Sequence, residues 1–126
     1  MINTNTALIT GASAGIGLEL ARIHAQKGGD LVLVARSKDK LESLKLELEH
    51  TYKIKVILVS EDLSLAGAAE RIFRQTERQG IEVNTLINNA GFGGHGIFHE
   101  RNLEDEQAMM QVNMVALTQL THYYLQ

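Results

Sequence analysis

The sequence predicts an α/β fold, a doubly wound parallel sheet with helices on both faces. Short apolar runs rich in β-branched residues alternate with longer segments of helical periodicity, and this alternation is typical of parallel sheets. The run 31–35 is apolar at every position, as expected of a strand that helices cover on both faces. Right-handed crossovers between parallel strands then predict the strand order 3-2-1-4.

The first strand is predicted at 6–10 and ends at a glycine. A helix is predicted over 15–27, because Ile16, Leu20 and Ile23 recur there at helical spacing. Two glycines follow this segment, as they often do at the C-terminus of a helix.

The run 31–35 is the second predicted strand, and the third is predicted at 55–59. Between them we expect a helix over 38–51, which Ser37 is placed to cap. Its buried face is expected to consist of leucines at helical spacing. These are Leu41, Leu44 and Leu48.

A third helix is predicted over 66–79 and a fourth strand over 85–88. A glycine-rich loop, 91–96, then precedes a last helix that runs to the end of the sequence. Asn102 is a favoured N-cap residue for this helix, and Asp105 stands three residues later in a capping-box-like position.

Composition and charge exclude several classes of protein. The 126 residues, 44% hydrophobic and 21% charged, predict a single globular domain over 1–126. The net charge of -3 argues against nucleic-acid binding, and the absence of cysteine excludes a disulfide framework. No apolar run approaches the ~20 residues of a membrane helix, and residues 1–6 lack signal-peptide features. We therefore expect a cytoplasmic protein without membrane contact.

A metal site is not expected. His95 and His99 are four residues apart, but Glu100 is the only carboxylate beside them.

A glycine loop, Thr10-Gly11-Ala-Ser-Ala-Gly15-Ile-Gly17, joins the first strand to the first helix. Gly11 allows a sharp turn, Gly15 leaves room for a pyrophosphate, and Gly17 allows close packing of the helix on the sheet. Free amides and the helix dipole favour an anion at this position, and the hydroxyls of Thr10 and Ser13 are candidate additional contacts. A glycine-rich turn without a ligand is the alternative.

Four motifs in order resemble those of the classical short-chain dehydrogenase/reductase (SDR) family. They are Thr10-Gly11-x3-Gly15-x-Gly17, Asp62-Leu63, Asn88-Asn89-Ala90-Gly91 and Asn113. The resemblance covers essentially the whole chain. It implies a Rossmann-like domain, truncated here before the fifth strand, and NAD(P)(H)-linked oxidation of an alcohol or reduction of a carbonyl.

The end of the second strand favours NADP(H) over NAD(H). Dinucleotide sites usually hold the ribose 2′-hydroxyl with an acidic residue here and a 2′-phosphate with arginine. Arg36 offers a planar fork of donors, Ser37 a hydroxyl, and Lys40 a further charge. Ala14 stands where similar NADP-using proteins often carry a basic residue, so NAD(H) remains the alternative cofactor and a solvated surface charge the alternative for Arg36.

The resemblance implies that Asp62 and Leu63 lie at the adenine and that Asn89 and Ala90 lie at the ribose. For Asn89 and Gly91, ordinary turn residues are the alternative. The predicted cofactor-binding set is Thr10, Gly11, Ser13, Gly15, Ile16, Gly17, Arg36, Ser37, Asp62, Leu63, Asn89, Ala90 and Gly91.

Catalysis in this family uses a serine and a tyrosine with lysine four residues later. Tyr52 is followed at that spacing by Val56, and Tyr123 and Tyr124 lie within four residues of Gln126, so all three tyrosines are interpreted as packing or surface residues.

Asn113 is the one catalytic-site residue that the resemblance assigns, with a helix-bending or capping residue as the alternative. We therefore expect no substantial reductase activity from this chain alone. A non-catalytic nucleotide-binding or interaction module is the alternative function, and an enzyme completed by a second chain is a third hypothesis without support in these residues.

The last helix carries a broad apolar stripe. It comprises Met109, Val112, Ala116, Leu117, Leu120 and Tyr124, widened by Met110, Met114 and Leu125. In the family this helix helps to form the oligomer interface, so the resemblance implies a homodimer or higher oligomer. It also implies that the loop 92–101 borders a substrate entrance.

Overall fold

The structure is a computed structural model that describes residues 5–126. Four parallel strands form one sheet in the order β3-β2-β1-β4. The strands are β1 (Thr6–Thr10), β2 (Asp30–Ala35), β3 (Val56–Ser60) and β4 (Thr85–Ile87). The predicted fold class and strand order are both confirmed.

Helices alternate with the strands along the chain. They are α1 (Gly15–Gln26), α2 (Lys38–Tyr52), α3 (Ala68–Arg78), the short 3-10 turn η1 (Phe98–Glu100), α4 (Leu103–Met110), the π-helical segment η2 (Gln111–Ala116) and α5 (Leu117–Tyr124). The predicted elements agree with these bounds to within one or two residues at most ends. The signal-peptide prediction concerned residues 1–6, of which 1–4 lie outside the described residues.

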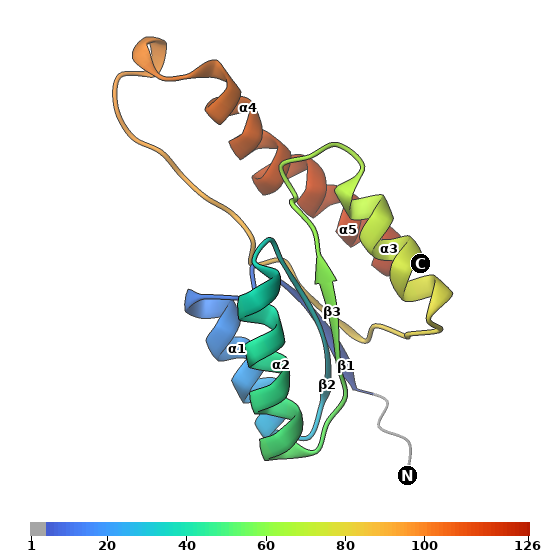
Figure 1. The fold of residues 1–126 in the computed structure, drawn as a ribbon. Helices are drawn as coiled ribbons and strands as arrows, with labels where there is room; N and C mark the ends of the chain where they lie inside the picture. Colours follow the sequence, from blue (N-terminus) through green and yellow to red (C-terminus); the bar gives the residue numbers. More distant parts are fainter. Residues whose placement is uncertain (1–4) are drawn as a thin grey trace.

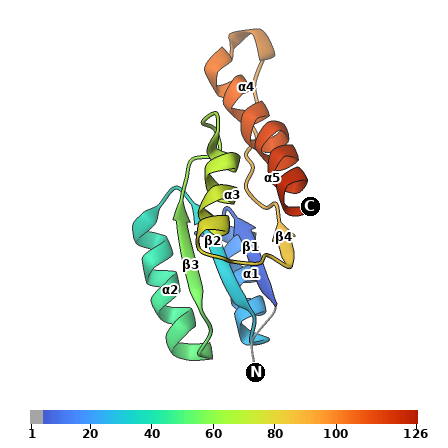
Figure 2. The ribbon, with the colours of Figure 1, turned by 90° about the vertical axis from the view of Figure 1, so that its right-hand side faces the viewer.

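Two layers of helices enclose the sheet. Helices α1 and α2 cover one face, and α3 and α5 cover the other (Figures 1 and 2). Alternate residues of each strand point to opposite faces, so Ile9 and Leu33 pack under α1 and α2, whereas Leu8 and Val32 pack under α3 and α5. This two-sided burial explains why the central strands are apolar throughout.

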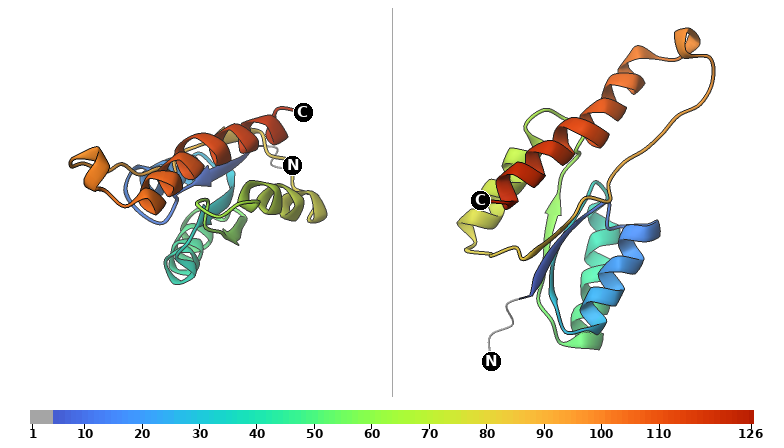
Figure 3. Two further views of the ribbon diagram at one scale, coloured as in Figure 1. Left: turned by 90° about the horizontal axis from the view of Figure 1, so that it is seen from above. Right: turned by 180° about the vertical axis from the view of Figure 1, so that it is seen from behind.

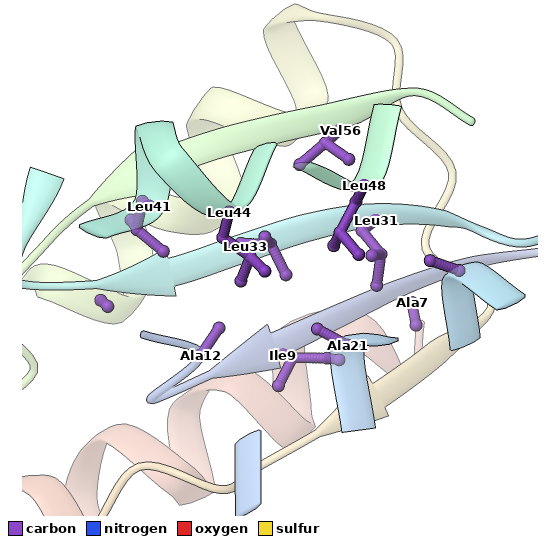
Figure 4. Packing of buried hydrophobic residues seen from close by; sticks show 12 residues of the cluster. Ala7, Ile9, Ala12, Ala21, Leu31, Leu33, Leu41, Leu44, Leu48 and Val56 are labelled. Atoms are coloured by element: carbon purple, nitrogen blue, oxygen red, sulfur yellow. The ribbon is translucent and has the colours of Figure 1, made fainter. Parts of the chain in front are cut away.

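The leucine face predicted for α2 is confirmed. Leu41, Leu44 and Leu48 are buried, and Figure 4 shows them beside Leu31 and Leu33 of the sheet. Ser37 stands at the N-cap of this helix, but its side chain makes no capping hydrogen bond, so that part of the prediction is wrong.

Two of the three residues whose spacing predicted α1 lie outside the core. Ile16 is 73% exposed and Ile23 is 49% exposed, whereas Ala21 and Ala25 are fully buried and Leu20 is partly buried against the same core. Small side chains occupy the contact with the core, on a helix whose first turn lies so close to the glycine loop that a Cβ at Gly17 would overlap the carbonyl oxygen of Gly11. The exposed isoleucines therefore lie on the side of α1 that faces away from the core.

The C-terminal helical stretch runs diagonally, with α5 beside α3 and α4 extending beyond the ends of the strands (Figures 1 and 3). Asn102 caps it as predicted, its Oδ1 accepting from the backbone N–H of Glu104 at 2.8 Å. A π-helical segment, residues 111–116, interrupts the α-helix. Such segments insert an extra residue per turn and so change which residues share a face.

The predicted apolar stripe is only partly buried. Val112, Ala116 and Leu120 are buried against the sheet and α3. Exposed members of the predicted stripe are Met110, Met114, Leu117 and Leu125.

Within residues 5–126 no helix is long and apolar enough to span a membrane, and no cluster of three or more His, Cys, Asp or Glu is placed to hold a metal ion.

Candidate functional site

The carboxyl ends of the four strands meet at one edge of the sheet. Thr10 ends β1 beside Val34 of β2, and Ala35 of β2 lies beside Ser60 of β3. A cavity of about 1060 Å³ opens at this edge, bounded by the loops that follow the four strands and by one face of α4 and η2. The predicted cofactor-binding residues all line this cavity except Thr10 and Gly17, and Asn113 also lies outside it.

The glycine loop lines the cavity, and its three glycines meet different steric requirements. Gly11 and Gly15 have φ values of +64° and +57°, a region that favours glycine. A Cβ at Gly15 would meet nothing within 4 Å, because this position faces the open cavity. A Cβ at Gly17 would collide with the carbonyl oxygen of Gly11 and lie 2.5 Å from Nδ2 of Asn89.

The N-terminus of α1 faces the cavity without a side-chain cap. The N-cap residue is Ala14, which has no side-chain hydrogen-bonding group, and no side chain caps the helix in its place. The first amides of a helix have no partners within the helix. The first turn, which includes Gly15 and Ile16, lines the cavity, so its amides and the helix dipole together favour an anion there.

Thr10 lies behind the cavity rather than in it. Its side chain is buried, and its Oγ1 accepts hydrogen bonds from the backbone N–H groups of Asn89 and Ala90 at 3.0 and 2.9 Å. The expected hydroxyl contact with a ligand is therefore not supported for Thr10. Its hydroxyl joins the end of β1 to the segment that follows β4.

Asn89 completes this connection from the other side. Its Nδ2 donates to the carbonyl oxygen of Gly11 at 3.1 Å. The glycine loop and the segment after β4, which are about eighty residues apart in the sequence, are thus held together by side chains of both.

Arg36 lies at the cavity wall immediately after β2. Its side chain is exposed and has no ion pair or side-chain hydrogen bond within residues 5–126. Its backbone carbonyl accepts from Oγ of Ser60 at 3.3 Å. Ser37 and Lys40 line the same part of the cavity, so the cationic and hydroxyl groups predicted for this end of the site are brought together.

Asp62 is fixed by the residue two positions later. Its Oδ1 accepts from the hydroxyl and the backbone N–H of Ser64 at 2.7 and 2.9 Å. These hydrogen bonds to the ionised form lower the pKa of the Asp62 carboxyl, and the charge of Arg36 lowers it further. A carboxylate of fixed orientation therefore borders the cavity beside the buried side chain of Leu63.

Asn113 anchors the loop that follows β4. Its Oδ1 accepts from the backbone N–H of Phe92 at 3.1 Å, and its Nδ2 donates to the carbonyl oxygen of Phe92 at 2.8 Å. A Cβ at Gly91 would lie 3.0 Å from Oδ1 of Asn113. Asn113 belongs to the π-helical segment η2. It therefore lies where the helix is distorted, as the alternative interpretation suggested, and it also contacts the loop that follows β4.

The tyrosines of α5 pack against α3, as predicted. The ring of Tyr123 stacks on Phe73 with centroids 5.0 Å apart, and the hydroxyl of Tyr124 lies 2.7 Å from Oγ1 of Thr76. Burial raises the pKa of Tyr124. Tyr52 is partly buried against the α1–α2 side of the core.

Several cavity residues were not predicted from the sequence. Glu61 directly precedes Asp62, which was predicted, so its position at the cavity could have been inferred from the sequence. Asp105, Ala108 and Val112 line the cavity from α4 and η2. No local pattern marks them as residues of the site, because their place there depends on how the C-terminal helix packs.

Comparisons with known proteins agree with this geometry. The short chain dehydrogenase family model matches residues 5–126. A relative from Arabidopsis thaliana, 11-beta-hydroxysteroid dehydrogenase-like 2, is 32% identical over 97% of this chain. Very-long-chain 3-oxoacyl-CoA reductase from Pyrenophora tritici-repentis is 37% identical over 91% of it. A short-chain dehydrogenase from Sphingobium yanoikuyae, solved in complex with NADPH, has a TM-score of 0.88 and 35% identity over 95% of the chain.

The chain spans less than half the length of these proteins. It covers 40% of the Arabidopsis relative, 35% of the Pyrenophora relative and 46% of the Sphingobium protein. The match nevertheless extends over every described strand and helix and over every loop that borders the cavity. With its 3-2-1-4 sheet and its glycine loop at the edge of that sheet, the chain belongs to the short-chain dehydrogenase family.

Proposed function

We propose that this chain is the NADP(H)-binding part of an SDR-type oxidoreductase. One observation carries the proposal: a helix N-terminus without a side-chain cap and Arg36, which has no ion pair within residues 5–126, face the same cavity at the carboxyl edge of a parallel sheet. Both features favour phosphate groups. Similarity to the Sphingobium protein solved with NADPH supports the same cofactor class.

The residues present fit a dinucleotide. Gly15 leaves open space before the first amides of α1, where a pyrophosphate would be held. Arg36 and Ser37 would bind a ribose 2′-phosphate, and Asp62 and Leu63 would border the adenine. The donor fork of arginine and the absence of a carboxylate directly after β2 favour NADP(H) over NAD(H).

The segment after β4 completes the proposed site. Asn89, Ala90 and Gly91 line the cavity after β4, whereas Arg36 lines it after β2, and they would border a ribose. Ser13 and Ile16 would contribute from the glycine loop and the first turn of α1. The bound cofactor would supply a hydride acceptor or donor, while these residues bind and orient it.

Arg36→Ala is expected to remove the preference for NADPH. Loss of a charge-assisted contact with the 2′-phosphate should weaken NADPH binding about tenfold or more and leave NADH binding within about twofold. Titration calorimetry of the 126-residue chain with both cofactors measures this. Arg74→Ala is the matched control, because Arg74 pairs with Glu70 on α3 and does not line the cavity.

The outcomes separate the parts of the proposal. Equal binding of NADPH and NADH by the unsubstituted chain would refute the NADP(H) preference alone. Absence of binding by a folded chain would refute the cofactor site and leave the interaction module as the better hypothesis.

By itself, the 126-residue chain is proposed to lack substantial reductase activity. Hydride transfer also requires a proton donor in reach of the substrate. No tyrosine within the 126 residues has lysine four positions later, and the side chain of Asn113 is occupied by the backbone of Phe92. Oxidation of NADPH followed at its absorbance maximum, with a panel of ketone and aldehyde substrates, should give no turnover above background. Measurable turnover by the purified chain would contradict this proposal.

Exposed apolar side chains at the end of α4, in η2 and at the start of α5 support a homodimer or higher oligomer through this helical stretch. Met114 is 61% exposed, and Met110 and Val115 also expose more than a third of their surface. Large exposed apolar groups on one element are typical of association surfaces. Light scattering is the direct measurement.

A further inference from the structure

The loop between β3 and α3, residues 61–67, is held by one arginine of the following helix. Arg71 makes a two-pronged ion pair with Glu61 at the start of the loop, with Nε–Oε1 and Nη2–Oε2 distances of 3.0 and 3.2 Å. Its remaining nitrogen, Nη1, donates to the carbonyl oxygen of Ala66 at 3.2 Å. A single guanidinium thus joins the first residue of the loop to its C-terminal end.

The conformation of the loop accommodates this contact. Gly67 has a φ of +81°, and a Cβ at this position would lie 3.0 Å from Nη1 of Arg71. Inside the loop, the backbone N–H groups of Ser64 and Leu65 donate to the side chain and carbonyl oxygen of Asp62. The local turn shapes the interior of the loop, and the arginine determines the separation of its ends.

The same loop is one wall of the cavity. Glu61, Asp62, Leu63 and Ser64 all line it, whereas Arg71 does not. The hydrogen bond and ion pair with Glu61 raise the pKa of Arg71, and an arginine is charged at every physiological pH. Because the side chain of Arg71 is 49% exposed, its ion pair is expected to add little to global stability, and its effect falls on the loop that it bridges.

We propose that Arg71 is a positioning residue for the adenosine end of the nucleotide, acting through the 61–67 loop. This inference rests on the proposed cofactor site. With Glu61 and Ala66 tied together, Asp62 and Leu63 are held at the cavity wall before the ligand binds. Without Arg71, the ligand has to order the loop during binding, which lowers the affinity. Glu61 also loses its partner and places an uncompensated negative charge at a site for an anion.

The test compares two arginines of α3. Arg71→Ala is expected to raise the Kd of adenosine 2′,5′-bisphosphate about fivefold or more, because both loop ordering and charge compensation are lost. Arg74→Ala removes another exposed ion pair of α3, to Glu70 at 2.6 Å, but no contact with the loop, and its Kd should stay within about twofold of the unsubstituted chain. Calorimetry on the folded 126-residue chain gives both values, and thermal unfolding of each variant is recorded alongside.

The possible results lead to different conclusions. A merely structural role would lower the thermal midpoint of Arg71→Ala and leave the Kd within twofold, which would overturn the inference. Failure of the unsubstituted chain to bind NADPH, NADH and the bisphosphate would instead refute the proposed function. Arg71→Lys serves as the second variant if Arg71→Ala does not fold. Lysine keeps the charge but cannot bridge Glu61 and Ala66 in the same geometry, so its Kd is expected between those of Arg71→Ala and the unsubstituted chain, and an unchanged Kd would overturn the inference.

Discussion

Gly17→Ala is expected to destabilise the fold by about 3 kcal/mol and to abolish nucleotide binding. The added methyl group would overlap the carbonyl oxygen of Gly11 and lie 2.5 Å from Nδ2 of Asn89. Neither neighbour can move freely, because Asn89 Nδ2 itself donates to that carbonyl. Relief of the overlap therefore requires α1 to move away from the glycine loop, and the amides at its N-terminus move with it.

Gly15→Ala is the matched control for the effect on stability alone, because Gly15 lines the proposed binding site. A Cβ at Gly15 would meet nothing within 4 Å, although its φ of +57° disfavours alanine. The expected cost is about 1 kcal/mol. Denaturant unfolding measures both variants, and calorimetry with NADPH measures their binding. Unfolding of Gly17→Ala at the denaturant concentration of the unsubstituted chain would contradict the steric explanation.

Thr10→Val is expected to destabilise the fold by about 2–3 kcal/mol. The substitution preserves the shape of the side chain but removes the oxygen that accepts from the N–H groups of Asn89 and Ala90. Since both donors are partly buried there, each loses a hydrogen bond that solvent replaces only in part. The segment after β4 should then detach from the end of β1, and NADPH binding should weaken with it.

Thr10→Ser separates the role of the hydroxyl from that of packing. Serine keeps the accepting oxygen and loses one buried methyl group, so we expect a loss of about 1 kcal/mol and nearly unchanged NADPH binding. If Thr10→Val and Thr10→Ser had the same unfolding midpoint and the same Kd for NADPH, the hydrogen bonds to the Thr10 hydroxyl would contribute nothing to stability or binding.

Much of the fold was predictable because it follows from local patterns. The predicted range of β1 agrees with the observed strand, Thr6–Thr10, and the leucine face of α2 packs as its spacing indicates. The strand order follows from alternation and crossover handedness alone. Since parallel strands present their carboxyl ends at one edge, Arg36, Asp62 and Asn89 could be expected together although they are far apart in the sequence.

Burial on α1 was not predictable in the same way. The spacing of Ile16, Leu20 and Ile23 predicted a helix, but the residues fully buried on it are Ala21 and Ala25. Hydrophobic spacing indicates that a helix has an apolar side. The distance between that helix and the sheet, which depends on Gly17, decides whether large or small residues fit.

The sequence by itself determined the α/β architecture, the order of the strands and the edge of the sheet at which the candidate site lies. Only the tertiary structure decided what individual polar side chains do there. Thr10 forms hydrogen bonds with residues 79 and 80 positions away, and Asn113 with a residue 21 positions away. Arg71 forms hydrogen bonds near both ends of the 61–67 loop. The physical reason is that periodicity and turn propensity arise from neighbours along the chain, whereas a hydrogen bond depends on the distance between groups that only the completed packing brings together.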